Sequence, residues 1–323
     1  MTKMHSSYIH FQIARLVNQF PTVYREAIFR KCNKKDIMGS KHTFYKTLNY
    51  MEKKQIILNP AISIKNHSNY TNRFYFIQGD DARKIMNDVL NRYRESIDVI
   101  FIFSSLQSDF LYIAAHEKID HIDGKIILED IVTEYRVIFP CKEHEKHSQR
   151  ILPQFILVPE YTRDEPLVWD EKMWEIYYWL KINYRLYNSE IGKQVGISPV
   201  TVARRKEKML PSLHIHYPVY AEGKDNYSVL FFILEDIPDL DKVLNLLSDL
   251  SATSYLVKGS KGTYLCFAST RRVHILAPKM RKAIGDESLG FSHFSSKWTP
   301  ILDDYKKEKI EERFFYMFPP RTK

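Results

Sequence analysis

The sequence predicts an α+β protein with two winged-helix or helix-turn-helix modules, each followed by a ferredoxin-like or related α/β sheet domain. Two observations lead to this fold class. A compact block with helical periodicity occurs twice, and a block of strand-like runs rich in aromatic and β-branched residues follows each one. With 323 residues, of which 44% are hydrophobic, the chain is also too long for one typical core. We therefore expect four domains, with limits at 1–79, 80–166, 167–225 and 226–323.

The first helical block begins near Ser7, where apolar residues recur at helical spacing until Pro21 ends the helix. A second short helix follows, and Ser40 then caps a third. Three helices and a β-hairpin together make a winged helix. The expected hairpin consists of two strand-like runs, 56–64 and 72–77, joined by a turn-forming segment, 65–71.

The region after this module reads as a linking helix, 80–96, followed by a sheet. Its apolar runs are short, and charged or turn-forming residues separate them, which is typical of strands. The strand candidates are 97–103, 109–115, 125–132 and 134–140.

The second helical block contains the stretch YNSEIGKQVGISPVTVARRKEKM, residues 187–209. Gly196 closes one short helix, Ser198 caps the next, and Pro199 stands at a first helical position, where its missing N–H does no harm. Two short helices joined in this way predict a helix-turn-helix. A second hairpin is expected after it, from 213–220 and 227–234.

The last block has the order strand, helix, strand, strand, helix, which is close to a ferredoxin-like fold. The strand 227–234 opens the block. The segments that follow it are 239–250, 254–259, 263–268 and 271–285, and a further helix is expected in the C-terminal tail.

The positive charge of the chain is concentrated in its first quarter. Residues 1–79 contain 13 lysines and arginines and three acidic residues, a net charge of +10, whereas the remaining 244 residues carry a net charge of −1. Solubility does not require such an asymmetry, but a module that binds a polyanion does. A merely basic surface is the alternative explanation. The distribution favours nucleic acid as a partner.

Each module offers a helix with groups suited to the major groove of DNA. In the second module, segment 181–210 carries seven basic and two acidic residues. Thr201 can reach a base edge, arginines can bond guanine or phosphate, and lysines can bond phosphate. An ordinary helical corner with solvated arginines is the alternative. The predicted DNA-binding residues are Lys41, His42, Thr43, Tyr45, Lys46, Asn49, Lys65, Arg73, Ser198, Thr201, Arg204, Arg205 and Lys208, of which Lys65 and Arg73 belong to the expected wing.

Residues 169–215 resemble the DNA-binding half of the Lrp/AsnC (feast/famine) family of prokaryotic regulators, on the matching pieces EKMWEIYYWLKI, SEIGKQVGIS and VTVARRKEKM. Residues 227–285 resemble its effector and oligomerisation domain, notably through ATSYLVKGSKGTYLCFA. The resemblance implies a transcription regulator that pairs with a second copy through its sheet domain and responds to a small-molecule effector. Ser260 and Lys261 replace the usual acidic residue, which argues against amino-acid sensing.

Other classes are disfavoured by what the sequence lacks. No apolar run reaches the roughly 20 residues that span a bilayer, the N-terminus lacks the apolar block of a signal peptide, and three distant cysteines make no disulfide framework. We therefore expect a cytoplasmic protein without a membrane partner. Cys141, His144 and His147 lack the second pair that a strong zinc pattern needs.

No phosphate-cradling glycine loop or nucleophile elbow is present, so neither a cofactor nor enzymatic activity is expected. Two rivals to the regulator stay open. One is a plasmid-type replication initiator, which also joins two winged helices. The other is an enzyme, because the Lrp-like scaffold is also used by tetrapyrrole (siroheme) decarboxylases, in which histidines and arginines handle a polyanionic macrocycle.

Overall fold

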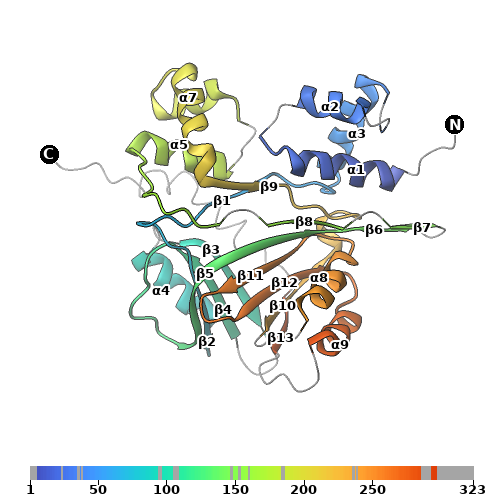
Figure 1. Ribbon diagram of the computed structural model, residues 1–323. Helices are drawn as coiled ribbons and strands as arrows, with labels where there is room; N and C mark the ends of the chain where they lie inside the picture. The colour runs from blue at the N-terminus through green and yellow to red at the C-terminus, as the bar shows by residue number, and fades with distance from the viewer. Residues whose placement is uncertain are drawn as a thin grey trace.

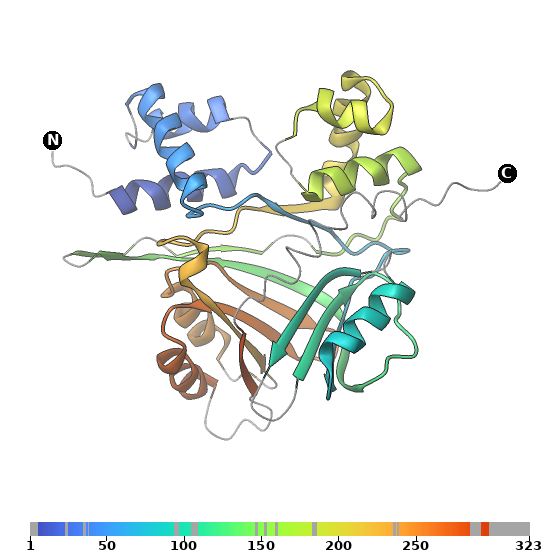
Figure 2. The same cartoon turned by 180° about the vertical axis from the view of Figure 1, so that it is seen from behind.

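The protein consists of two helical modules on one side, a β-sandwich on the other, and a thin layer of extended chain between them (Figures 1 and 2). The structure is a computed structural model. The residues that it describes are 6–22, 25–34, 37, 39–93, 97–104, 109–145, 148–151, 154–158, 161–182, 186–234, 237, 239–284 and 292–296.

The first helical module is formed as the sequence predicts. Its helices are α1 (Ser6–Gln19), α2 (Arg25–Lys34) and α3 (Lys41–Lys53). The Ser40 hydroxyl accepts a hydrogen bond from the Thr43 N–H at 3.5 Å, which confirms the predicted cap of α3. The buried face of α3 consists of Phe44, Leu48 and Met51.

The second module repeats this plan with α5 (Glu171–Ile182), α6 (Asn188–Val195) and α7 (Pro199–Met209). Gly196 adopts a left-handed conformation with φ of 72°, which ends α6 as expected. The Ser198 hydroxyl accepts a bond from the Thr201 N–H at 3.1 Å. A short 3₁₀ turn, Leu210–Ser212, follows α7.

Both expected hairpins are wrong. Strand β1 (Ala61–Ile64) pairs antiparallel with β9 (Leu213–His216), more than 140 residues away along the chain. Strand β2 (Arg73–Gly79) pairs instead with two sheet strands. The turn-forming segment does not hold a hairpin, because the side chains of Asn66 and Asn69 bond the backbone of Val132 and Leu167. We call the β1–β9 pair the ribbon.

The β-sandwich contains the same strand pattern twice, which confirms the expected α+β class. In the first half the order along the sheet is β5-β2-β4-β3, and in the second half it is β13-β10-β12-β11. Both are the order of a ferredoxin-like sheet. Among the residues that the structure describes, the second half has two helices and the first half has one. The remaining elements are α4 (Ala82–Tyr93), β3 (Ile97–Ser104), β4 (Asp109–Ala115), β5 (Lys125–Phe139), a 3₁₀ turn (Lys224–Asn226), β10 (Ser228–Leu234), α8 (Leu240–Ser248), β11 (Ser254–Gly259), β12 (Tyr264–Thr270), α9 (Val273–Ile284) and β13 (Ser292–Ser296).

Strand β5 joins the two halves into one nine-stranded sheet by pairing with β2 on one side and β11 on the other. It is a single strand of 15 residues, where the sequence predicted two shorter ones. Strand β8 (Phe155–Leu157) also pairs with β5, and β6 (Lys142–Glu145) with β7 (Ser148–Ile151) forms a separate two-stranded arm.

Aromatic side chains from both halves fill the interior of the sandwich. Phe76 of β2 meets Phe231 of β10 with ring centroids 5.0 Å apart, and Tyr112 of β4 meets Phe267 of β12 at the same distance. Helix α4 covers the outer face of the first half, and α8 and α9 cover that of the second (Figure 1). Each such buried side chain contributes roughly 1.5–3 kcal/mol, so the halves are firmly packed together.

The four domain limits stay a prediction, and the expected C-terminal helix lies outside the described residues. Within the described part of the chain, no helix combines the length and the apolar character needed to cross a membrane.

Candidate functional site

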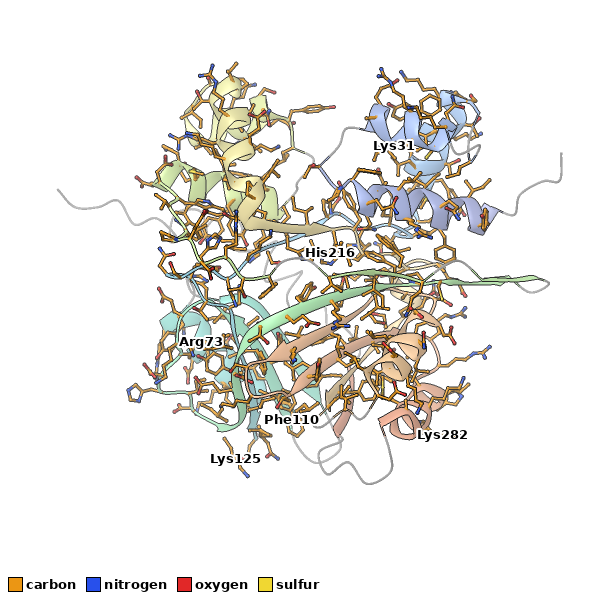
Figure 3. All side chains as sticks on the ribbon, viewed as in Figure 1. Lys31, Arg73, Phe110, Lys125, His216 and Lys282 are labelled. Atoms are coloured by element: carbon orange, nitrogen blue, oxygen red, sulfur yellow. The ribbon has the colours of Figure 1, made fainter. Side chains whose placement is uncertain are left out.

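A cavity of about 370 Å³ lies between the ribbon and the top of the sandwich. Figure 3 shows His216 on the ribbon and Arg73 on the sandwich below it. The walls come from parts of the chain that are distant in sequence. The strands contribute Ala61 and Ser63 of β1, Arg73 of β2, Tyr135 of β5, His216 of β9 and Tyr255 of β11. Lys181 comes from α5, Lys224 from the 3₁₀ turn before β10, and Tyr161 from the segment after β8.

The roof of the cavity follows from the two-residue period of a strand. In β1, Ile62 and Ile64 are buried in the core of the second helical module, so Ala61 and Ser63 face the opposite way. In β9 the partner strand likewise buries alternate residues in that core. His216 therefore points away from the helices and lines the cavity.

A row of three tyrosines forms one wall. The rings of Tyr161 and Tyr135 stack with centroids 6.0 Å apart and an interplanar angle of 27°. The rings of Tyr135 and Tyr255 stack at 5.9 Å and 28°. Burial raises the pKa of Tyr135 and of Tyr255 well above the usual range, so both remain neutral phenols. The row is a surface for a flat, apolar ligand.

Two buried histidines stand beside this row. The rings of His214 and His216 stack 5.1 Å apart, and His216 Nε2 lies 3.2 Å from the Tyr255 hydroxyl. Burial, with a smaller effect of Lys65, lowers the pKa of His214 to about 4. Burial, followed by the effect of His214, lowers the pKa of His216 well below its usual value. Both imidazoles are neutral at pH 7.

Three cationic side chains converge on the cavity. Arg73 is the first residue of β2, Lys181 lies in the last turn of α5, and Lys224 begins a 3₁₀ turn before β10. All three are half-buried. Among the described residues that line the cavity, none is acidic. A partly enclosed cationic site with aromatic walls suits an organic anion, because partial burial strengthens each charge interaction.

The helix predicted to contact DNA in the first module is accessible, but part of its polar surface is engaged within the protein. Lys41 pairs with Glu26 at 2.6 Å, and the Tyr45 hydroxyl bonds the same carboxylate at 3.3 Å. The hydrogen bond from Lys41 is the main cause that lowers the pKa of Glu26. The predicted residues with exposed side chains on α3 are Lys41, His42, Thr43, Lys46 and Asn49.

The corresponding helix of the second module shows the same division. Arg204 and Lys208 are exposed on α7. Arg205 instead forms an ion pair with Asp170, and this pairing is the main cause that lowers the pKa of Asp170. Ser198 and Thr201 bond each other through their hydroxyl groups at 2.8 Å, in the cap of the helix.

The two residues predicted to lie on a wing are elsewhere, because the expected hairpin is absent. Arg73 lines the cavity. Lys65 is half-buried, and its backbone N–H bonds the Ser212 carbonyl at 3.0 Å. DNA contact by these and the other predicted residues stays a prediction.

The cavity itself was missed in the sequence. The alternation of His214 and His216 along a strand is visible there, but such an alternation is also typical of a strand that packs in a core. No local pattern indicates that His216 meets a tyrosine of β11, or that cations from β2 and α5 converge on it. These contacts depend on the pairing of strands that are far apart in the chain.

No protein-family model and no curated protein sequence matches the chain. The solved structures that are similar to it include two crystal structures of a siroheme decarboxylase. The crystal structure of the siroheme decarboxylase NirDL is 12% identical in sequence, with a TM-score of 0.41, and the match covers 95% of this chain and 99% of that chain. The co-complex of the same decarboxylase with an iron-uroporphyrin III analogue is 11% identical, with a TM-score of 0.40 and the same coverage.

These findings correct one expectation from the sequence. The absence of familiar catalytic motifs led to the expectation that the chain is not an enzyme. The comparisons contradict that expectation, because the two solved structures named above are those of an enzyme, a siroheme decarboxylase. The Lrp/AsnC resemblance implies a helix-turn-helix followed by a ferredoxin-like sheet. Both are present in the C-terminal half of the chain.

Proposed function

We propose that the chain binds a flat organic polycarboxylate in the cavity under the ribbon, and that carboxylated tetrapyrroles are the ligand class. The observation that carries the proposal is that Arg73, Lys181 and Lys224 line the same cavity as a row of stacked tyrosines. The tyrosine row offers its rings to an extended apolar body, while the three cations offer bonds to carboxylates at its edge.

The strength of such binding comes mainly from the cations. A hydrogen bond to a charged group contributes roughly 1.5–3 kcal/mol, more than a neutral one. Because the arginine fork bonds both oxygens of a carboxylate, Arg73 is expected to set the orientation of the ligand. The lysines then fix further carboxylates as point charges.

Decarboxylation of a tetrapyrrole such as siroheme is the most specific form of the proposal. In that reaction the bond to a carboxylate carbon breaks and CO₂ leaves. The electron pair remains on the methylene carbon, which must then take up a proton. The Tyr255 hydroxyl, bonded to His216 at 3.2 Å, is a neutral proton donor in the cavity. His216 then stabilises the phenolate and solvent restores the proton.

A titration of the purified protein with iron-uroporphyrin III, followed by absorbance, tests the binding step. We expect saturable binding, and the variant Arg73→Met should bind about 10- to 100-fold more weakly, since it loses a charged hydrogen bond. The control is Arg92→Met, which removes an exposed arginine of α4 that does not line the cavity. No binding by the wild type, or equal binding by both variants, contradicts the proposal.

The reaction is tested with siroheme and measurement of released CO₂. The variant Tyr255→Phe keeps the stacked ring and loses the hydroxyl, so we expect turnover to fall while binding of iron-uroporphyrin III persists. Removal of a general acid typically costs about 10²- to 10⁴-fold in rate. If the wild type binds the macrocycle and releases no CO₂, the cavity is a binding site without this reaction.

Binding of duplex DNA by the helical modules is a second candidate function. The observation that favours it is the exposure of cations on two N-capped helices that both lie on the side of the molecule away from the sandwich (Figure 2). A sequence-specific regulator would use the two helices on one asymmetric site. A replication initiator, the remaining rival of this class, would bind repeated sites.

Fluorescence anisotropy with labelled duplexes at several salt concentrations tests this candidate. Each cation that neutralises a phosphate contributes about 0.9 to the slope of log affinity against log salt. We expect the slope to fall by about that amount for each of Lys46→Ala, Arg204→Ala and Lys208→Ala. Lys125→Ala, an exposed position at the far end of the sandwich in Figure 3, is the control. Equal slopes for all four variants would contradict DNA binding by these helices.

A further inference from the structure

The ribbon belongs to both helical modules at once, because the chain exchanges strands between them. Residues Ile56 and Ile57, just after α3, are buried in the core of the first module. Five residues later, Ile62 and Ile64 are buried in the core of the second module. The strand that leaves the first module therefore supports the second one.

The return strand makes the reverse exchange. Leu213 and Ile215, just after α7, are buried in the core of the second module. The continuation of the same strand buries Tyr217 and Val219 in the core of the first module. Each module thus packs against a strand that leads out of the other module. The packing of both modules therefore depends on the crossing, the place where the two strands pass from one module to the other.

Polar clamps fix this crossing at the first module. The buried side chain of Asn18 on α1 accepts a bond from the Tyr217 N–H at 2.6 Å and donates to the Tyr217 carbonyl at 3.0 Å. At Val219, the backbone N–H donates to the Thr253 hydroxyl at 2.9 Å, and the carbonyl accepts from the Thr253 N–H at 2.8 Å. The strand is therefore attached above to α1 and below to the sandwich.

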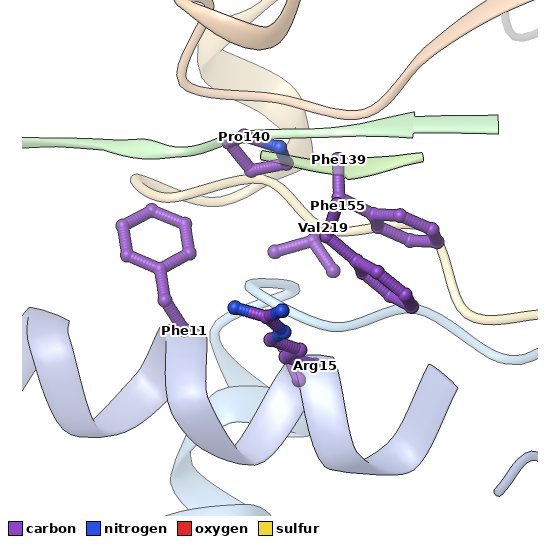
Figure 4. A pocket seen from close by; sticks show the side chains of 7 residues that line it. Phe11, Arg15, Phe139, Pro140, Phe155 and Val219 are labelled. Carbon is purple, nitrogen blue, oxygen red and sulfur yellow. The ribbon is translucent and has the colours of Figure 1, made fainter. Parts of the chain in front are cut away.

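Two spaces lie along the exchanged strands. Under α1, a hollow of about 20 Å³ is lined by Val219, which belongs to the continuation of β9. Figure 4 shows Arg15 rising from α1 into it between Phe11 and Phe155, and the guanidinium carbon lies 5.3 Å from the centre of the Phe155 ring. Under the crossing itself lies the cavity of about 370 Å³, which Ala61, Ser63 and His216 line from above.

We propose that the ribbon couples the cavity to the helical modules, so that an organic polyanion bound under the ribbon changes the distance between α2 of the first module and α7 of the second. The proposal rests on the proposed ligand site and adds its regulation. One face of β1 and β9 lines the cavity, and the opposite face packs against the helices of the second module. A ligand in the cavity therefore contacts the strands that support these helices. Any partner that spans both modules is then linked to the ligand, and the linkage is reciprocal.

Pulsed electron paramagnetic resonance between two spin labels tests the coupling. The labels are placed at Arg30→Cys on α2 and Lys208→Cys on α7, two exposed positions. The three native cysteines are buried and do not compete for the label. With iron-uroporphyrin III as the probe, we expect the maximum of the distance distribution to shift. An unchanged distribution in protein that has bound the probe overturns the coupling and leaves the ligand site standing.

A variant that fills the cavity tests the coupling without the probe. Ser63→Trp places a large ring under the ribbon and should shift the maximum of the distribution in the absence of ligand. Ser68→Trp, at an exposed position after the ribbon, is the matched control and should not shift it. Ser63→Leu replaces the first variant if the larger ring prevents folding. If the wild type does not bind the probe, the proposed function fails, while a shifted maximum with filled position 63 still supports the coupling and an unchanged distribution still overturns it.

Discussion

The cavity and the outer face of the helical modules are both cationic, but they hold their cations in different ways. In the cavity, Arg73 and Lys181 are half-buried beside stacked tyrosines. On the outer face, Lys46, Arg204 and Lys208 are exposed. Enclosed charges interact strongly and select a ligand by shape, whereas exposed charges attract any polyanion and are screened by salt. Positive charge alone therefore does not distinguish the two kinds of partner. The distinction depends on whether each cation is half-buried or exposed.

The ribbon lies between these two regions. The largest expected effect concerns its attachment to α1. Asn18→Leu leaves the N–H and the carbonyl of Tyr217 without partners in a buried place. Each orphaned group costs roughly 1–3 kcal/mol, so we expect the free energy of unfolding to fall by about 4 kcal/mol. Urea denaturation measures this change. Asn49→Leu, on the exposed face of α3, is the chemically matched control and should have little effect.

The second difference between the regions is the charge state of the histidines near the cavity. The folded-state pKa of His214 is about 4, below the usual value of 6.5, because the ring is buried. The unfolded chain therefore takes up this proton first as the pH falls. The stabilisation is complete above pH 6.5 and is lost between pH 6.5 and 4, and it amounts to about 3 kcal/mol.

Unfolding measured across this pH range checks the expectation. His214→Gln should have a shallower loss of stability between pH 6.5 and 4 than the wild type. His42→Gln, which changes an exposed histidine of α3, should keep the wild-type acid slope. Equal slopes in all three proteins would show that His214 is solvated and that the cavity roof is not the apolar environment described above.

The smallest effect concerns the outer face, where Glu26 engages Lys41 and Tyr45. Glu26→Gln removes the carboxylate and leaves Lys41 available for a phosphate. If the helices bind DNA, the slope of log affinity against log salt should steepen by about 0.9. Glu52→Gln, which removes another carboxylate of the first module, is the control. An unchanged slope in Glu26→Gln would indicate that Lys41 does not approach the DNA backbone.

Local patterns in the sequence predicted much of the fold correctly. Ser40 and Ser198 cap α3 and α7, and Gly196 ends α6 in a left-handed conformation, as their positions indicated. The helix, strand, strand, helix order after residue 239 is also confirmed. These features were predictable because a cap, a turn or an amphipathic face is decided within a few residues.

The pairing of strands was predicted wrongly, for a physical reason. A short apolar run flanked by turn residues suggests a hairpin with its neighbour, which is the commonest arrangement. Here the side chains of Asn66 and Asn69, in the segment after β1, bond the backbone of Val132 and Leu167. Strand β1 pairs instead with β9, which is distant in the sequence. Arg73 was consequently assigned to a DNA-binding wing, although it lines the cavity.

The sequence by itself determined the two helical modules, their capped helices and the excess of positive charge in the first quarter of the chain. Tertiary structure alone decided that β1 and β9 exchange between the modules and that Arg73, Lys181 and His216 surround one cavity. The physical reason is range. Helix signals arise from neighbouring residues, whereas the partner of a strand is selected by burial of side chains brought together from the whole chain.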